Sequence, residues 1–195
     1  MDFLRLDYIY KSSNVKKNST YINFLKYSMK KEILNFTVCL LVINDEVLLG
    51  LKSKKIGAGC RNGYGGMVEQ GETVVGAAIR ELEEETGKKI GNTFITTSPE
   101  FLDKVAIIDF KNTKKDGTFF VCRVHFFIVK KWIGQAVDTD EMTDSKFFRI
   151  DNLPFSQMMP KDSEYFPLIL SGKKILAKTD FKSMKIKEVS SFPKD

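Results

Sequence analysis

One stretch of the chain, residues 62–87, constrains what the rest can fold into: NGYGGMVEQGETVVGAAIRELEEETG. Its first part is rich in glycine, which adopts backbone conformations that a side chain would forbid. A helix is predicted to begin near Thr73, whose hydroxyl suits an N-cap, and to stop at Gly87. Apolar residues recur along it at helical spacing, so one side of this helix is expected to pack inward.

The other side of the predicted helix carries three carboxylates, those of Glu81, Glu84 and Glu85, at positions i, i+3 and i+4. Like charges at this spacing repel one another and weaken a helix unless something compensates. A hard divalent cation would compensate, because Mg²⁺ prefers oxygen ligands and commonly shares its coordination shell with substrate phosphates. Taken alone, three acids at this spacing more often form a solvated face, so the interpretation depends on the residues around them.

The surrounding pattern resembles the Nudix box, which reads G, five residues, E, seven residues, R-E-apolar-x-E-E-x-G-apolar. The matching positions are Gly66, Glu72, Arg80, Glu81, Leu82, Glu84, Glu85 and Gly87. Only the last position departs, with Lys88 where an apolar packing residue is expected. Members of this family hydrolyse a nucleoside diphosphate linked to another group, so the resemblance implies an enzyme that uses Mg²⁺, with Mn²⁺ as the alternative metal.

Within this family the chain is similar, over residues 34–170, to the mammalian MutT homologues. The similarity extends beyond the box to LLGLKSKKIGAGCRNGYGG at residues 48–66, DEM at 140–142, LPF at 153–155 and FPLIL at 166–170. It implies hydrolysis of oxidised purine nucleoside triphosphates, such as 8-oxo-dGTP or 2-hydroxy-dATP, to the monophosphate and pyrophosphate. Such an enzyme keeps damaged nucleotides out of polymerases.

The resemblance also implies roles for individual residues. The metal would be held by the backbone carbonyl of Gly65 and by four carboxylates, those of Glu81, Glu84, Glu85 and Glu141. Arg80 and Glu72 would brace the helix against its loop. Glu85 would both bind metal and activate water, although the spacing of coupled carboxylates does not tell which one takes the proton. The nucleotide would be bound by Thr37, Lys52, Asn62, Tyr64 and Phe110, with Asn62 on the purine and Lys52 as a compact charge near the phosphates.

The segment expected to read the base departs from that subfamily. Where the subfamily has a tryptophan platform and two adjacent aspartates, this chain has Met159, Lys161 and Asp162. One stacking aromatic and one carboxylate are therefore missing, and we expect a weaker preference for the oxidised purine. The alternative is that Lys161 points into solvent and that Asn62 with Asp162 suffices.

The hydrophobic pattern indicates a mixed α/β protein. It predicts strands at residues 36–43, 47–49, 105–110, 118–129 and 146–150, with hairpin turns at 44–45 and 114–117. A second helix is predicted at 165–170, capped by Ser163 and stopped by Gly172, and residues 174–189 suggest an edge strand or hairpin. The expected architecture is a Nudix-type α/β/α sandwich, formed as one domain by residues 34–195. His125, the only histidine, lies in a predicted strand and is expected to have a structural or surface role.

Residues 1–33 are expected to form a basic, disordered extension. Residues 1–35 hold seven Lys or Arg against three Asp or Glu, which leaves +4 of the net charge of +6 outside the domain. No basic groove for nucleic acid is therefore expected, and no apolar run is long enough to span a membrane. The three cysteines lack metal-ligand spacing and suggest a reducing compartment. We expect a cytoplasmic monomer acting on a small-molecule nucleotide, with organelle import through the extension as the alternative.

Two other functions remain open from the sequence. The chain could be a Nudix hydrolase for another substrate, such as a dinucleoside polyphosphate, a nucleotide sugar or a cap-like nucleotide. It could also be a nucleotide-binding module without catalytic activity. The second is disfavoured because none of the acids of the box is lost.

Overall fold

The computed structural model describes residues 32–90, 93–114, 116–180 and 183–193. The predicted N-terminal extension lies outside these residues except for its last two, with which the first strand begins. Of the helices in the described ranges, none has the length and apolar character needed to cross a membrane.

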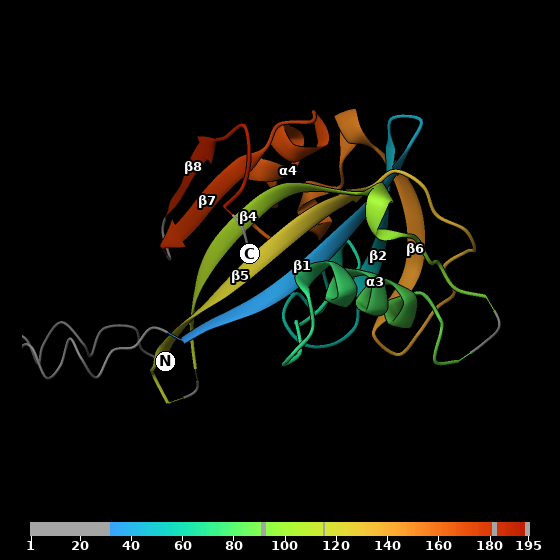
Figure 1. The fold of residues 1–195 in the computed structure, drawn as a ribbon, viewed down its shortest axis with the longest axis horizontal. Coiled ribbons are helices and arrows are strands. Elements are labelled where there is room, and N and C mark those ends of the chain that lie inside the picture. The colour runs from blue at the N-terminus through green and yellow to red at the C-terminus, as the bar shows by residue number, and fades with distance from the viewer. Residues whose placement is uncertain (1–31, 91–92, 115, 181–182, 194–195) are drawn as a thin grey trace, which may run out of the picture. The chain divides into compact units, whose positions relative to one another are not determined.

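The described residues form one eight-stranded sheet (Figure 1). Its strands are β1 Glu32–Ile43, β2 Glu46–Lys52, β3 Arg61–Asn62, β4 Leu102–Thr113, β5 Phe119–Val129, β6 Met142–Arg149, β7 Ile175–Asp180 and β8 Ser183–Glu188. The order is β3-β2-β1-β5-β4-β7-β8, and β6 pairs with β2. The β1–β5 and β4–β7 pairs are parallel and the remaining pairs are antiparallel, which confirms the predicted mixed sheet.

Two α-helices, α3 Val74–Glu85 and α4 Asp162–Leu170, pack on opposite faces of the sheet. Successive side chains of a strand point to opposite faces. Accordingly Val38 and Leu40 of β1 belong to the core that holds Phe166 of α4, whereas Cys39 belongs to the core that holds Leu82 of α3. The α/β/α sandwich is therefore confirmed. Three short 3₁₀ helices, Pro99–Phe101, Ile150–Asn152 and Phe155–Gln157, complete the described structure.

Most predicted elements are present, and some boundaries differ. The Thr73 hydroxyl caps α3 by accepting from the backbone N–H of Gly76 at 3.0 Å. Asn44 and Asp45 both have positive φ, of 49° and 60°, as a tight hairpin turn requires. Residues 174–189 contain the β7–β8 hairpin.

The prediction that Ser163 caps the second helix is wrong. Helix α4 already begins at Asp162, so Ser163 lies inside its first turn, and Lys161 stands at the cap without a side-chain capping bond. The side chain of Asp162 instead accepts the backbone N–H of Met159 at 3.1 Å, which fastens the chain just before the helix.

Candidate active site

The glycine-rich loop lies against both strand β1 and helix α3. A Cβ atom on Gly65 would stand 2.0 Å from the backbone oxygen of Thr37, and one on Gly66 would stand 2.4 Å from the carboxylate of Glu81. The overlap at residue 65 is with backbone, so only glycine lets the loop approach β1 this closely, whereas a side chain at residue 66 would displace the carboxylate of Glu81. The loop is fixed by a hydrogen bond of 2.8 Å from the backbone N–H of Thr37 to the carbonyl of Gly66.

Glu85 is the most buried of the three predicted acids and forms an ion pair with Lys52. The distance from Lys52 Nζ to Glu85 Oε1 is 2.7 Å, and the two side chains are 9% and 3% exposed. The other carboxylate oxygen of Glu85 accepts the backbone N–H of Gly65 at 2.7 Å. Burial raises the pKa of Glu85, and the positive charge of Lys52 opposes this shift. Lys52, predicted to lie near the phosphates, thus contacts Glu85, predicted to bind the metal.

Arg80 links the loop to the acids of the helix. Its Nε and Nη2 donate to the two carboxylate oxygens of Glu72 at 2.9 Å each, and its Nη1 donates to Glu81 at 2.9 Å. Nη1 also lies 3.7 Å from the carboxylate of Glu84. The hydrogen bonds from Arg80 lower the pKa of Glu72. This geometry supports the predicted bracing role of Arg80 and Glu72.

The remaining acids are held by lysines. Lys55 Nζ lies 2.8 Å from Glu141, and Lys89 Nζ lies 2.6 Å from Glu84. The hydrogen bond to Glu141 raises the pKa of Lys55, with contributions from the charges of Glu81 and Glu85. The carboxylates of α3 and of the loop that carries Glu141 therefore create one region of negative potential that attracts cations.

The donor chemistry of this region fits a hard divalent cation. The predicted ligands, Glu81, Glu84, Glu85, Glu141 and the carbonyl of Gly65, are all oxygen donors, which Mg²⁺ and Mn²⁺ prefer. In the described ranges, no three His, Cys, Asp or Glu side chains are grouped as a metal site, and each of the four acids is engaged by a cationic side chain. A metal ion would exchange places with the exposed ammonium groups of Lys55 and Lys89.

Residues predicted to bind the nucleotide meet around Gly57. A Cβ on this glycine would lie 3.8 Å from Cδ of Lys52, 3.9 Å from Sδ of Met159 and 4.0 Å from Nδ2 of Asn62. These side chains come from β2, β3 and the segment before α4, which are far apart in the sequence. Thr37, which is also predicted to bind the nucleotide, is buried, and its hydroxyl has no hydrogen-bond partner within the described residues.

Asp162 is buried beside this group and has two neutral donors. Its Oδ1 accepts from the hydroxyl of Tyr165 at 2.7 Å, and its Oδ2 accepts from the backbone N–H of Met159 at 3.1 Å. Burial raises the pKa of Asp162 to about 6. The ring of Tyr165 packs edge-on against Phe110 at a centroid distance of 6.2 Å, which brings Phe110 into the same neighbourhood. Tyr165 is not among the residues predicted from the sequence, although its i+3 spacing from Asp162 on a helix could have indicated it.

Two further predicted nucleotide-binding residues, Tyr64 and Lys161, have well-defined partners in the structure. Tyr64 is fully buried in the core beneath α3, and its hydroxyl donates to Ser145 Oγ at 2.7 Å. Its ring has no exposed surface for a nucleotide, so the structure corrects its assignment from pocket lining to packing. Lys161 lies at the start of α4 with its Nζ 3.4 Å from Glu164 Oε1, and its side chain is 26% exposed.

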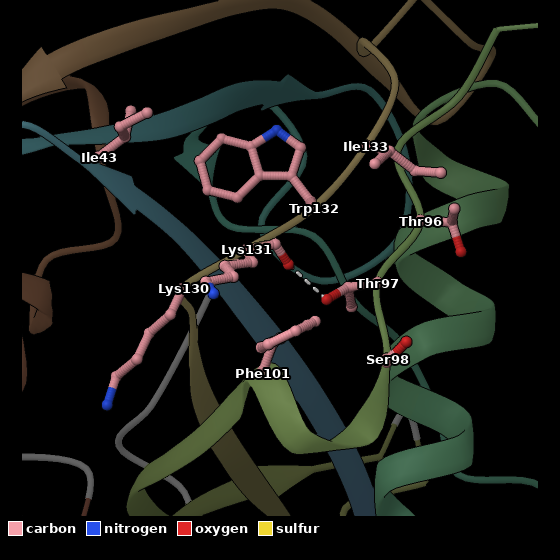
Figure 2. A pocket seen from close by; sticks show the side chains of 9 residues that line it. All are labelled: Ile43, Thr96, Thr97, Ser98, Phe101, Lys130, Lys131, Trp132 and Ile133. Atoms are coloured by element: carbon pink, nitrogen blue, oxygen red, sulfur yellow. Dashed lines mark hydrogen bonds between the residues drawn. The ribbon is translucent and has the colours of Figure 1, made fainter.

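Two other hollows lie outside this group of residues. The first, of about 690 Å³, is lined by Ile43, Thr96, Thr97, Ser98, Phe101, Lys130, Lys131, Trp132 and Ile133 (Figure 2). It contains none of the predicted site residues. The second, of about 770 Å³, contains only Glu72 of that set.

The NUDIX domain family matches residues 34–169, which is most of the chain. The chain belongs to the Nudix family. As a Nudix hydrolase it is an enzyme, and enzymes of this family act on nucleotide derivatives with the help of divalent metals.

Two curated relatives and two solved structures illustrate the similarity. The chain is 34% identical over 163 residues to the oxidized purine nucleoside triphosphate hydrolase of Mus musculus, covering 80% of this chain and 96% of that protein. It is 38% identical over 146 residues to the protein of the same name from Danio rerio, covering 72% and 81%. A MutT protein from Bacillus halodurans has the same fold, with a TM-score of 0.62 at 19% identity over 78% of this chain and 97% of that one. A MutT protein from Methanosarcina mazei superposes with a TM-score of 0.55 at 16% identity, covering 73% and 96%.

Proposed function

We propose that this Nudix hydrolase removes oxidised purine nucleoside triphosphates from the nucleotide pool. It would convert 8-oxo-dGTP or 2-hydroxy-dATP to the monophosphate and pyrophosphate. The observation that carries the proposal is the meeting around Gly57 of Lys52, which contacts the acid Glu85, with Asn62 and Met159. A base held by the last two residues would place its phosphates next to the acidic helix. The two vertebrate relatives carry the name of this activity.

In this proposal Mg²⁺, or Mn²⁺ in its place, is held by Glu81, Glu84, Glu85, Glu141 and the carbonyl of Gly65. Once bound, the metal would neutralise phosphate charge and lower the pKa of an attacking water. The protein's own groups fix the geometry. The Gly65 N–H orients Glu85 at 2.7 Å, and Arg80 holds Glu81 at 2.9 Å. Lys52 supplies a positive charge that turns from Glu85 toward a phosphate oxygen.

The proposed base pocket combines three polar groups of different character. The carbonyl oxygen of Asn62 accepts the N–H of Gly63 at 2.9 Å, which leaves its amide Nδ2 directed toward the space near Gly57. Asp162, with a pKa of about 6, is close to the point where it can either donate or accept a hydrogen bond. The hydroxyl of Thr37 is buried without a hydrogen-bond partner within the described residues, so we include it as the third polar group of the proposed pocket. This mixture suits a purine edge, which presents both donors and acceptors.

Turnover on a nucleotide panel tests the proposal. The panel contains 8-oxo-dGTP, 2-hydroxy-dATP, dGTP and dATP, together with a dinucleoside polyphosphate, a nucleotide sugar and a cap analogue. We expect pyrophosphate release that requires Mg²⁺, stops on chelation, and shows the highest kcat/KM on an oxidised purine triphosphate. A higher kcat/KM on one of the last three compounds would assign another substrate class. No metal-dependent hydrolysis of any compound would contradict an active enzyme.

The proposal also includes a monomer located in the cytoplasm. Light scattering of the purified chain measures its mass in solution, and a fluorescent fusion of the full chain shows its compartment.

A further inference from the structure

The face of the sheet that carries α3 is covered by that helix only in part. Helix α3 packs on β1, and in Figure 1 it lies well away from β7 and β8. Next to it, the same face forms the hollow of about 770 Å³. Its lining comes from five strands, from the loop and first turn that precede the acids, and from the segment after β8: Asn35, Val68, Glu72, Val74, Ile107, Asp109, Arg123, His125, Leu176, Ala177, Lys178, Lys185, Lys187 and Pro193. We call this hollow the lysine groove.

The charges of the lysine groove are unbalanced. It contains four Lys or Arg and two Asp or Glu. Both acids are already engaged, because Asp109 receives two hydrogen bonds from Arg123, at 2.8 and 3.1 Å, and Glu72 is held by Arg80. Among the described residues, no carboxylate lies within ion-pair distance of the three lysines, Lys178, Lys185 and Lys187. None of the three ammonium groups therefore forms an ion pair within the described residues, although Asp109, held by Arg123, stands opposite Lys178 in the strand register.

The register of the strands forces two of these lysines together. Lys178 of β7 stands directly opposite Lys185 of β8, and Lys187 follows two residues later on the same face. Like charges directly opposite one another destabilise a sheet. The arrangement costs stability unless an anion lies between the ammonium groups. The cross-strand neighbours Ile107 and Leu176 form an apolar floor beside them.

We propose that the lysine groove is a second binding site, separate from the proposed catalytic site, and that its ligand is a polyphosphate group. Ammonium groups bind phosphate oxygens as point charges, and three of them match the several charges of a di- or triphosphate. A volume of about 770 Å³ lies within the range of small-molecule pockets. The groove holds none of the proposed metal ligands. It does include Glu72, which accepts hydrogen bonds from the bracing Arg80.

Two sources could supply such a group, a free inorganic polyphosphate or the phosphate chain of a nucleotide. Calorimetric titration of the full chain with inorganic tripolyphosphate and, separately, with ADP distinguishes them. Both titrations are done in EDTA, so that the metal-dependent site does not contribute. Equal or tighter binding of tripolyphosphate indicates that the phosphate chain alone is recognised. Tighter binding of ADP indicates that the apolar floor contacts a nucleoside.

The variants K178Q/K185Q/K187Q and K130Q/K131Q/K146Q form a matched pair, because each removes three exposed positive charges. We expect the first to weaken the binding of tripolyphosphate at least tenfold and the second to change it less than twofold. Tripolyphosphate should raise the melting temperature of the wild type and of the control, but not that of the groove variant. Without anion, the groove variant should melt no lower than the wild type, because it loses a like-charge pair.

Three results would overturn the proposal: no binding of either ligand by the wild type, equal weakening in both triple variants, or an unchanged affinity in the groove variant. The kcat of the groove variant should equal that of the wild type, since none of its three lysines belongs to the proposed active site. The titration needs no turnover, so its outcome is independent of whether the proposed hydrolysis is observed.

Discussion

The acidic helix α3 and the first turn of α4 each bury a carboxylate, but the two carboxylates have partners of different charge. On α3, Glu85 is buried against the ammonium of Lys52, and Arg80 connects the acids that remain. At α4, Asp162 is equally buried but has only the hydroxyl of Tyr165 and a backbone N–H as partners. Neutral donors compensate desolvation less than a cation does, which explains why the pKa of Asp162 rises to about 6.

This difference suggests that the two regions serve different purposes, α3 the reaction and the α4 region the recognition of the base. In the charged region, Arg80 and the acids of α3 belong to the continuous stretch 62–87, and the family pattern departs only at the next residue, Lys88, while Lys52 comes from β2. The α4 region departs from the subfamily at Met159 and Lys161. We therefore propose that most of the reacting groups come from one local segment, whereas the choice of base depends on residues contributed by several distant ones.

The largest effect is expected from Glu85→Gln, which removes a charge from the proposed metal shell. We expect kcat to fall on the order of a hundredfold to a thousandfold, with nucleotide affinity changed by only a small factor. The variant should also be less stable by about 3–5 kcal/mol, because the Lys52 ammonium stays buried without its partner. Steady-state kinetics and urea unfolding measure the two effects.

The double variant K52M/E85Q separates catalysis from stability. It removes both charges of the buried pair, so it should recover most of the lost stability while turnover stays low. An intact turnover number in Glu85→Gln would remove Glu85 from the proposed catalytic role.

Arg80→Ala tests the bracing of the acidic region. It removes a bidentate contact with Glu72 and a bond to Glu81, in a side chain that is only 25% exposed. Because these hydrogen bonds are charge-assisted, we expect their removal to lower the unfolding free energy by about 2 kcal/mol and to lower kcat. Arg149→Ala is the matched control, because Arg149 contacts Asp151 with the same two-bond geometry at the surface. Equal losses in the two variants would show that Arg80 has no special bracing role.

What the sequence could predict follows the same division. The acidic helix, its Thr73 cap and its Gly87 stop depend on local spacing, and the structure has them as predicted. Strand β3 was missed because it is only two residues long and exists through its pairing with β2. Tyr64 was assigned to the pocket because the face that a side chain takes depends on the register of a loop against β1.

The lysine groove could not be predicted for a related reason. The net charge of the domain is small, and this average conceals a local excess of cations. Lys178 and Lys185 face each other only because β7 and β8 pair in one particular register. Asp109 of β4 lies beside Lys178 only because β4 and β7 run parallel. Such pairings between distant segments are not encoded in the local pattern of either segment.

The pH dependence of stability tests whether Asp162, with its neutral partners, titrates as the structure indicates. Its pKa is raised from 3.8 to about 6, so between these values the folded protein binds more protons than the unfolded chain. Its contribution to stability is therefore complete below pH ~4 and is lost as the pH rises through about 6, with a total of about 3 kcal/mol. Asp162→Asn should abolish this dependence. The difference in unfolding free energy between variant and wild type should change between pH 4 and 7; a constant difference would mean that Asp162 titrates normally.

The smallest effect is expected from Lys161→Asp, which changes the choice of base. In 8-oxo-guanine N7 carries a proton and donates, whereas in guanine N7 accepts. Lysine offers donors and no acceptor, so a Lys161 that faces the base leaves the oxidised form unpaired, at roughly 1–3 kcal/mol. We therefore expect Lys161→Asp to raise the ratio of kcat/KM for 8-oxo-dGTP over dGTP by about tenfold. The ratio in the wild type should accordingly be low.

The ion pair with Glu164 supplies the competing outcome. Lys161 Nζ lies 3.4 Å from Glu164 Oε1, so the ammonium already has an ion-pair partner on the first turn of α4. This position does not require a contact with the base. If it stays there, Lys161→Asp and the control Lys161→Ala both leave the ratio unchanged. If Lys161 faces the base, alanine removes the wrongly placed donors and recovers part of the ratio, and only aspartate supplies an acceptor and recovers more. An increase in the order lysine, alanine, aspartate therefore identifies position 161 as a contact to the base, and a flat series leaves the reading of the purine to Asn62 and Asp162.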